Sequence, residues 1–285
     1  MMNIKRVTIL HLIFAILVLN GCTSRPIVPS SLEGKLEPVF DEAVEPGVPE
    51  LVIERTKEPT LEIADPHEAI LDHKYFKIIY DTRTRLAKYV TYELRADQLR
   101  QPRAKRRNKF MPDPLLVKRK LPFVEPSEYT KSGYDRGHLA PAADFSWNQE
   151  AQDRTFVMSN MVPQKPNLNR DAWRRLEERV RRWACGEEHI TVVTGPILEN
   201  RLPKLKSGLP VPQKFFKIVI DETPPKKSIA FVFSQTDKGD VIEQRKIAVS
   251  ALSKVNGVHL PVGLLNRSGL RSPANLEEWK EKDCR

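Results

Sequence analysis

The chain has 285 residues, enough for one sizeable domain with a hydrophobic core and additional segments. It carries 47 Lys and Arg against 37 Asp and Glu, a formal net charge of +10. The first 22 residues contribute +2 and residues 23–68 contribute −7, which leaves +15 on residues 69–285. A basic body suits a polyanion such as nucleic acid, although a solvated basic surface explains the same charge. The chain has no HExxH motif, paired CxxC motifs or P-loop, which argues against a zinc enzyme or a P-loop nucleotidase.

The first 21 residues have the organisation of an export signal. A basic start, Met1–Arg6, precedes thirteen mostly apolar residues, Val7–Leu19, fewer than the ~20 that a membrane span needs. The next residues complete the sequence LNGC at 19–22, which resembles the lipobox of a bacterial lipoprotein. The resemblance implies a lipid on Cys22 and a lipid anchor in the cell envelope, and Thr23 favours the outer membrane, facing the periplasm or the exterior. An ordinary secretory signal with an incidental cysteine is the alternative.

Residues 22–68 are predicted to form an acidic, proline-rich tether, because so few apolar side chains cannot offset the entropy of ordering the segment. The folded domain is expected over residues 69–265, followed by a carboxy-terminal extension over residues 266–285 that contains an extra helix. Two further cysteines, Cys185 and Cys284, can pair in an oxidising compartment and tie this extension to the domain. Two separate buried thiols are the alternative.

Apolar patterning predicts the elements of the domain. The predicted strands are, in chain order, 75–80, 86–94, 190–194, 215–220 and 229–233, and a turn at 81–84 joins the first two into a hairpin. Residues 101–120 are basic and irregular. A short helix is predicted at 149–157 and a longer amphipathic helix at 169–184, with Asn169 at its N-cap. Strands broken by helices without regular alternation predict an α+β fold on a mostly antiparallel central sheet.

Three segments carry the chemistry: YDRGH at 134–138, SNMVPQ at 159–164 and LNRDAWRRLE at 168–177. In this order they resemble the DRGH, SN-x-x-PQ and LN-x-x-x-W-x-x-LE motifs of the DNA/RNA non-specific endonuclease family. DRGH alone would be a weak match, but the ordered trio is specific. The resemblance extends from about residue 75 to the strands near residue 233, and it fades after residue 246. It implies a ββα-metal (His-Me finger) active-site unit.

His138 is the candidate general base. A histidine has an unperturbed pKa of ~6.5, so a neutral imidazole can accept a proton from water at physiological pH. In the family the matching histidine has this role, whereas a core or surface histidine is the alternative. With an unperturbed pKa for His138, activity is expected to fall below about pH 6.5.

Asn169 is the candidate metal ligand, because an amide oxygen is a hard, neutral donor that suits Mg²⁺. Its alternative role is the helix cap, and one side-chain oxygen cannot serve both roles fully. Glu177 lies eight residues further on, ~12 Å along a helix, too far to share direct coordination. It is assigned to the outer shell, where it would hold metal-bound water or an arginine. A salt bridge to Arg181 on a solvated face is the alternative.

Basic residues supply the other candidates for catalysis. Arg136 could contact phosphate or fix its own loop, and Asp135 is expected to orient a neighbour. The family also uses an upstream arginine to stabilise transition-state charge, a role that suits the guanidinium fork. Arg106 and Arg107 are the candidates, with Arg107 preferred, and a solvated basic loop is the alternative. Asn160 is expected to brace the site.

Together these residues predict a divalent-metal-dependent endonuclease that hydrolyses phosphodiester bonds of DNA and RNA outside the cytoplasm. Mg²⁺ is the expected cofactor, with Mn²⁺ as a substitute, and DNA and RNA are the expected partners. The lipid on Cys22 would add a membrane contact, and a homodimer is left open. The alternative, from a different class, is a non-catalytic envelope lipoprotein that binds polyanions through its basic domain.

Overall fold

The computed structural model describes residues 65–261, 263 and 275–284. The predicted export signal, most of the predicted tether, and residues 266–274 and 285 of the carboxy-terminal extension lie outside the described residues. Within the described ranges, no helix is both long enough and apolar enough to cross a membrane.

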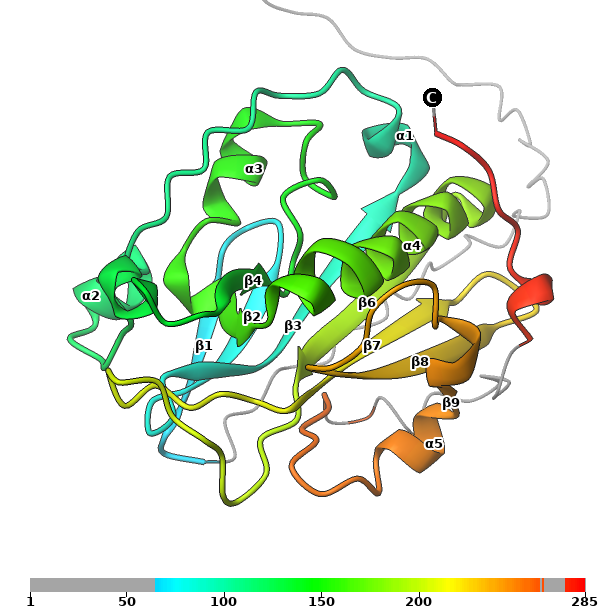
Figure 1. Ribbon diagram of the computed structural model, residues 1–285. Coiled ribbons are helices and arrows are strands. Elements are labelled where there is room, and N and C mark those ends of the chain that lie inside the picture. Colours follow the sequence, from blue (N-terminus) through cyan, green and yellow to red (C-terminus); the bar gives the residue numbers. More distant parts are fainter. Residues whose placement is uncertain (1–64, 262, 264–274, 285) are drawn as a thin grey trace, which may run out of the picture. The chain divides into compact units, whose positions relative to one another are not determined.

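A seven-stranded antiparallel sheet forms the centre of the domain, in the order β1-β2-β3-β6-β7-β8-β9 (Figure 1). Its strands are β1 (Glu68–Asp72), β2 (Lys77–Asp81), β3 (Leu86–Arg95), β6 (His189–Pro196), β7 (Lys214–Asp221), β8 (Lys227–Ser234) and β9 (Lys246–Ile247). This architecture confirms the predicted α+β fold and its five strands. The sequence analysis missed β1, which begins at the boundary with the acidic segment, and β9, which is two residues long.

In the described part of the chain, five α-helices accompany the sheet: α1 (Ala96–Leu99), α2 (Pro114–Lys118), α3 (Gln149–Arg154), α4 (Trp173–Glu187) and α5 (Val249–Leu252). The residues of β7 show how the sheet separates two cores. Phe215 and Val219 belong to the core beneath α4, whereas Phe216 and Ile218 belong to the core on the opposite face, which α5 covers. Each face of the sheet is therefore packed against other parts of the chain.

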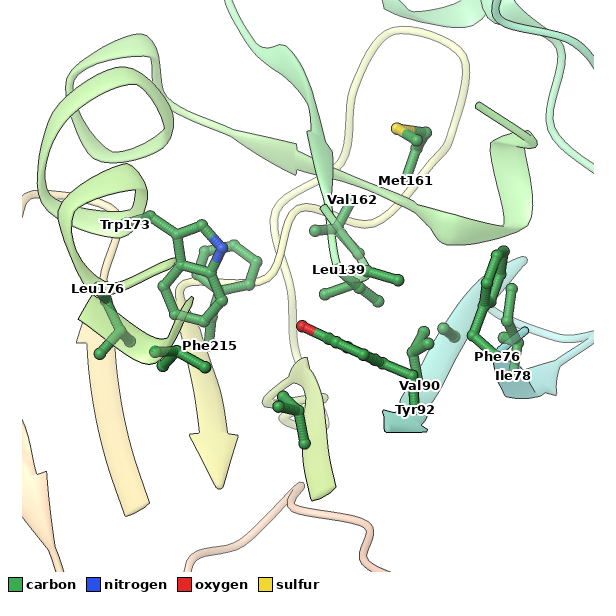
Figure 2. Close-up of a cluster of buried hydrophobic side chains, with 14 of the residues drawn as sticks. Phe76, Ile78, Val90, Tyr92, Leu139, Met161, Val162, Trp173, Leu176 and Phe215 are labelled. Carbon is green, nitrogen blue, oxygen red and sulfur yellow. The ribbon is translucent and has the colours of Figure 1, made fainter. Parts of the chain in front are cut away.

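The core beneath α4 joins three parts of the chain (Figure 2). Trp173 and Leu176 of α4 gather with Phe215 of β7 on one side, and Phe76 and Ile78 lie on the other (Figure 2). Between them, Leu139 and Val162 pack toward Val90 and Tyr92 of β3, and Met161 is the remaining labelled side chain of the cluster (Figure 2). Burial of these large apolar groups fixes α4 against the sheet.

A separate two-stranded unit contains the DRGH motif. Strand β4 (Asp135–His138) pairs antiparallel with β5 (Met161–Gln164), and His138 lies opposite Met161. The sequence analysis assigned no strand to either segment, because both are short and lack alternating apolar residues. With α4, which follows β5 in the chain, they form a ββα arrangement (Figure 1).

The start of the long helix differs from the prediction. A π-helical turn, Leu168–Ala172, precedes the regular helix α4, which continues to Glu187. Asn169 lies inside this turn and is not the N-cap, because the turn begins at Leu168 and Asn167 holds the N-cap position. The Asn169 side-chain amide donates to Asp135 across the site. The N-cap prediction was therefore wrong, and its failure leaves the amide oxygen of Asn169 for another role. π-Helical turns are frequent at functional sites.

Residues 275–284, named the C-terminal strap here, lie against α4. Cys284 forms a disulfide with Cys185 near the carboxyl end of α4, with a Cα–Cα distance of 5.5 Å. Glu281 accepts from Arg179 and Arg182 at 2.7 and 3.0 Å. The predicted disulfide is thus present. The extra helix is absent from the described part of the extension, which contains one 3-10 turn, Leu276–Glu278.

Candidate active site

The imidazole of His138 is held by two aromatic rings. Its ring centroid lies 5.0 Å from that of Phe156, edge to face, and 5.9 Å from that of Phe110. Within the described part of the chain, Nε2 is buried without a hydrogen-bond partner, although the residue as a whole is only half-buried and lines an open pocket. The nitrogen that remains for contact with the pocket is therefore Nδ1.

Burial sets the charge of this imidazole. Burial and, to a lesser degree, the positive charge of Arg106 lower the pKa of His138 from 6.5 to about 3. A neutral imidazole can accept a proton, so His138 is in the form that a general base requires at physiological pH. The expected loss of activity below about pH 6.5 assumed an unperturbed imidazole, and the structure corrects that assumption.

The same two phenylalanine rings position arginines beside His138. The guanidinium of Arg106 lies 5.3 Å from the Phe156 centroid, and that of Arg136 lies 4.8 Å from the Phe110 centroid. Arg136 also donates to the carbonyl of Pro126 at 3.0 Å. Neither phenylalanine is predicted from the sequence, because an isolated aromatic residue in a basic loop or after a helix carries no motif.

Arg106 and Arg107 take different positions. Arg106 lines the pocket, and its Nε donates to Asn108 Oδ1 at 2.7 Å. Arg107 instead forms an ion pair with Asp153 at 3.1 Å and is not among the residues that line the pocket. The geometry therefore favours Arg106 over the preferred Arg107. Nothing in the sequence separates these adjacent arginines, since only tertiary packing decides which of them faces His138.

Asp135 orients the π-helical turn across the site. Its Oδ2 accepts from Asn169 Nδ2 at 2.9 Å, and its two oxygens accept from Arg170 at 2.8 and 2.6 Å. The carboxylate therefore fixes the rotation of the Asn169 amide, with Nδ2 directed at Asp135. Oδ1 is then the end of the amide that can serve a cation.

Asn160 braces the backbone immediately after His138. Its fully buried side chain accepts from Ala140 N at 2.9 Å and donates to the carbonyls of Ala140 and Thr155, each at 2.9 Å. Because all of these partners are backbone groups, the amide ties two loops together without facing the pocket. This is the bracing role that the sequence analysis expected.

Glu177 faces the pocket from the first turns of α4. The alternative for this residue, a salt bridge to Arg181, is not formed, because Arg181 donates to the buried carboxylate of Asp144 at 2.7 Å. Tyr92 Oη also donates to Asp144, at 2.9 Å. Burial is the main cause that raises the pKa of Glu177, and the charge of Asp144 raises it further, whereas Lys217 and Arg181 lower it.

The pocket between these groups is rich in arginine. Its lining includes Arg103, Arg106, Arg136, Arg170, Arg174, Arg181 and Arg182, together with His138, Asn169 and Glu177. Guanidinium groups present a planar fork of donors that matches phosphate oxygens. The structure thus brings four of the five predicted site residues, all but Arg107, to one pocket.

The donor set fits a hydrated divalent cation. Asn169 offers a neutral amide oxygen, and Glu177 offers a carboxylate on the same helical segment. Among the described residues there is no cluster of three His, Cys, Asp or Glu side chains that could hold a metal. Few protein oxygens and several retained waters are the coordination that Mg²⁺ prefers.

The fold and the pocket define the class of protein: an antiparallel α+β domain with a ββα unit that places a neutral histidine beside arginines and an oriented amide oxygen. Residues 63–266 match the sequence profile of the DNA/RNA non-specific endonuclease family. The chain belongs to this family, whose members are metal-dependent, and it is a nuclease that acts on nucleic acids. The alternative of a non-catalytic polyanion-binding lipoprotein is therefore not retained.

Individual relatives agree with this assignment. The chain is 30% identical to human mitochondrial endonuclease G over 212 residues, which cover 68% of this chain and 70% of the human protein. It is 34% identical to endonuclease G of Caenorhabditis elegans over 222 residues (71% and 67%), and 32% identical to a nuclease of Nostoc sp. over 171 residues (60% and 61%). A solved structure of the EndoG/EndoGI complex superposes with a TM-score of 0.59 at 25% identity, covering 67% of this chain and 84% of that chain.

Proposed function

We propose that the protein is a Mg²⁺-dependent endonuclease that hydrolyses phosphodiester bonds of both DNA and RNA without sequence preference. The observation that carries the proposal is the meeting of His138, Asn169 and Glu177 in one arginine-lined pocket. A site that contacts the phosphate backbone and not the base edges binds nucleic acid without reading sequence.

His138 would act as the general base. Its pKa, lowered by burial, leaves the imidazole neutral, and Nδ1 is the nitrogen that the pocket can reach. The attacking water would transfer its proton to Nδ1 as its oxygen bonds to phosphorus, and the bond between phosphorus and the leaving oxygen would break. Phe156 and Phe110 hold the ring, so the nitrogen needs little reorientation before the reaction.

Positive side chains and a cation would stabilise the charge on the phosphoryl oxygens. Arg106 is the proposed transition-state arginine, because it shares the Phe156 ring with His138. Arg136, packed on Phe110, would position the loop or contact a neighbouring phosphate. Asn169 Oδ1, and Glu177 through water, would hold Mg²⁺, with Mn²⁺ as a substitute. When bound, the ion supplies Lewis acidity to the phosphate and to the leaving oxygen.

The test is digestion of plasmid DNA and of RNA by the purified protein, with Mg²⁺ and with excess EDTA, beside His138→Ala. Wild-type protein is expected to degrade both substrates only with the metal, and His138→Ala is expected to lose at least about 100-fold in rate. His189→Ala, a histidine paired with Glu93 away from the pocket, is the matched control. Digestion that survives EDTA, or that His138→Ala leaves intact, would contradict the proposal.

We further propose that the nuclease is exported and anchored in the cell envelope through a lipid on Cys22, in the outer membrane. The LNGC sequence at 19–22 supports this, and so does the Cys185–Cys284 disulfide, because such bonds persist in oxidising compartments. Residues 22–68 would form the tether. Fractionation of cells that express Cys22→Ala tests the anchor: the wild type is expected with membranes and the variant in the soluble envelope fraction. Equal membrane association of both would overturn it.

A further inference from the structure

Lys217 presents a buried charge that the chemistry described above does not use. It lies on β7 between Phe215 and Val219, faces α4 and has no exposed surface. Its Nζ lies 4.9 Å from the centroid of the Trp173 ring, and within the described part of the chain it has no hydrogen-bond partner. Burial removes the hydration of an ammonium group, and an opposite charge nearby is needed to offset that loss.

The charges around Lys217 leave Glu177 as its counter-charge. Glu177, Asp144 and Arg181 are the charged groups that act on it. Asp144 and Arg181 already pair with each other at 2.7 Å, and Asp144 also accepts from Tyr92. Trp173, which the ammonium approaches, and Glu177 lie four residues apart and therefore share one stripe of α4.

A second buried lysine in this fold has its ammonium group fully paired. Lys227, on the adjacent strand β8, lies 5.0 Å from the centroid of Trp279. Its Nζ donates to Glu187 at 2.8 Å and to the carbonyl of Glu278 at 3.0 Å. The fold therefore can pair a buried lysine directly, and it does not do so at Lys217.

We propose that Lys217 is a positioning residue, whose buried ammonium attracts the Glu177 carboxylate and holds it at the edge of the pocket to accept hydrogen bonds from water around a bound cation. The inference rests on the proposed function. A carboxylate that supports the water shell of a metal is effective only while it stays charged and correctly oriented. The direct ligand, Asn169, is oriented independently by Asp135.

The experiment measures Mn²⁺ affinity by isothermal titration calorimetry for the full-length wild type and for Lys217→Met, Glu177→Gln and the double variant. Methionine approximates the length and volume of lysine without its charge. We expect Lys217→Met to weaken Mn²⁺ binding by at least about tenfold, the scale found for groups that support metal ligands. In the Glu177→Gln background the same change is expected to have no further effect, because its target is gone. Lys227→Met, the matched control, is expected to bind Mn²⁺ like the wild type.

Thermal unfolding shows whether each variant is folded, and Lys217→Gln provides the same comparison if Lys217→Met does not fold. Wild-type affinity in the folded Lys217 variants would overturn the inference, as would an equal loss of affinity with and without Glu177. Either result would leave the proposed function standing if the wild type still binds Mn²⁺ and cleaves DNA. A wild type that neither binds Mn²⁺ nor cleaves would instead remove the proposed function and this inference with it.

Discussion

At its carboxyl end, α4 is tied to the C-terminal strap by paired groups, whereas near its amino end the side chains of Asn169 and Lys217 are less completely paired. The disulfide, the Glu281 ion pairs and the Lys227–Glu187 contact all lie at the end beside the C-terminal strap. Near the amino end, the Asn169 amide is oriented by a single carboxylate, and Lys217 Nζ has no hydrogen-bond partner in the described structure. An unpaired buried polar group costs stability, and such groups are frequent at functional sites. The groups at the strap end therefore mainly stabilise the fold, although Arg182 and Cys284 also line the pocket, and the groups proposed for catalysis lie toward the amino end of α4.

Removing the disulfide should produce the largest change in stability. Cys284→Ser is expected to lower the free energy of unfolding by about 2–5 kcal/mol, because the bond closes a long loop in the unfolded chain. Its cleavage rate at 25 °C is expected to change little. Urea unfolding and plasmid cleavage check the two statements, and a reducing agent should destabilise the wild type but not the variant. A loss of cleavage with unchanged stability would reverse the assignment of the two ends.

Asn169→Ala should show the opposite pattern. Its cleavage rate is expected to fall by about 100- to 1000-fold, ~2.7–4 kcal/mol in activation free energy, as when one electrostatic contributor to a transition state is removed. Its thermal stability is expected to stay near that of the wild type, because the residue is half-buried and its amide has one side-chain partner. Asn167→Ala, at the exposed N-cap position of the same turn, is the control. A comparable loss of activity in both variants would show that the turn, and not the amide, matters.

Substitution of Gly137 tests the packing of β4, the strand that also contains His138. A Cβ at this position would lie 2.2 Å from Gln164 Oε1, and Gln164 is fully buried. Gly137→Ala is therefore expected to lower the free energy of unfolding by about 1–3 kcal/mol through overpacking. Gln164→Ala in the same chain should recover part of this loss, which urea unfolding would measure. No recovery in the double variant would mean that another contact requires the glycine.

The smallest expected effect is a shift in the pH dependence of cleavage, and it distinguishes the role of Arg106 from that of Arg107. The charge of Arg106 lowers the pKa of His138, so Arg106→Ala should raise that pKa. A larger fraction of His138 is then protonated at a given acidic pH, and the acid limb of kcat/KM moves to higher pH. We expect a shift of up to about one pH unit, which corresponds to a difference of ~1.4 kcal/mol between the protonated and the neutral imidazole. Arg107→Ala, paired with Asp153, should leave the limb in place. An equal shift in both variants would contradict the placement of Arg106.

The sequence predicted the sheet, the long helix and the motif residues because each has a local signature. Continuous apolar runs define β7 and β8, and the spacing of apolar residues defines α4. What it could not predict depends on tertiary packing. The π-helical turn at Asn169 is stabilised by Asp135, 34 residues earlier in the chain. The choice of Arg106 depends on the Phe156 ring, and the lowered pKa of His138 depends on burial.

The most direct test of the account is anomalous diffraction from a crystal of the protein soaked in Mn²⁺. The account predicts one ion about 2.1 Å from Asn169 Oδ1, with its remaining ligands mainly water. Glu177 is expected to contact that water and not the ion itself. A strong anomalous peak elsewhere in the pocket, or a crystal with no peak beside Asn169, would contradict the central claim that this amide holds the cation opposite His138.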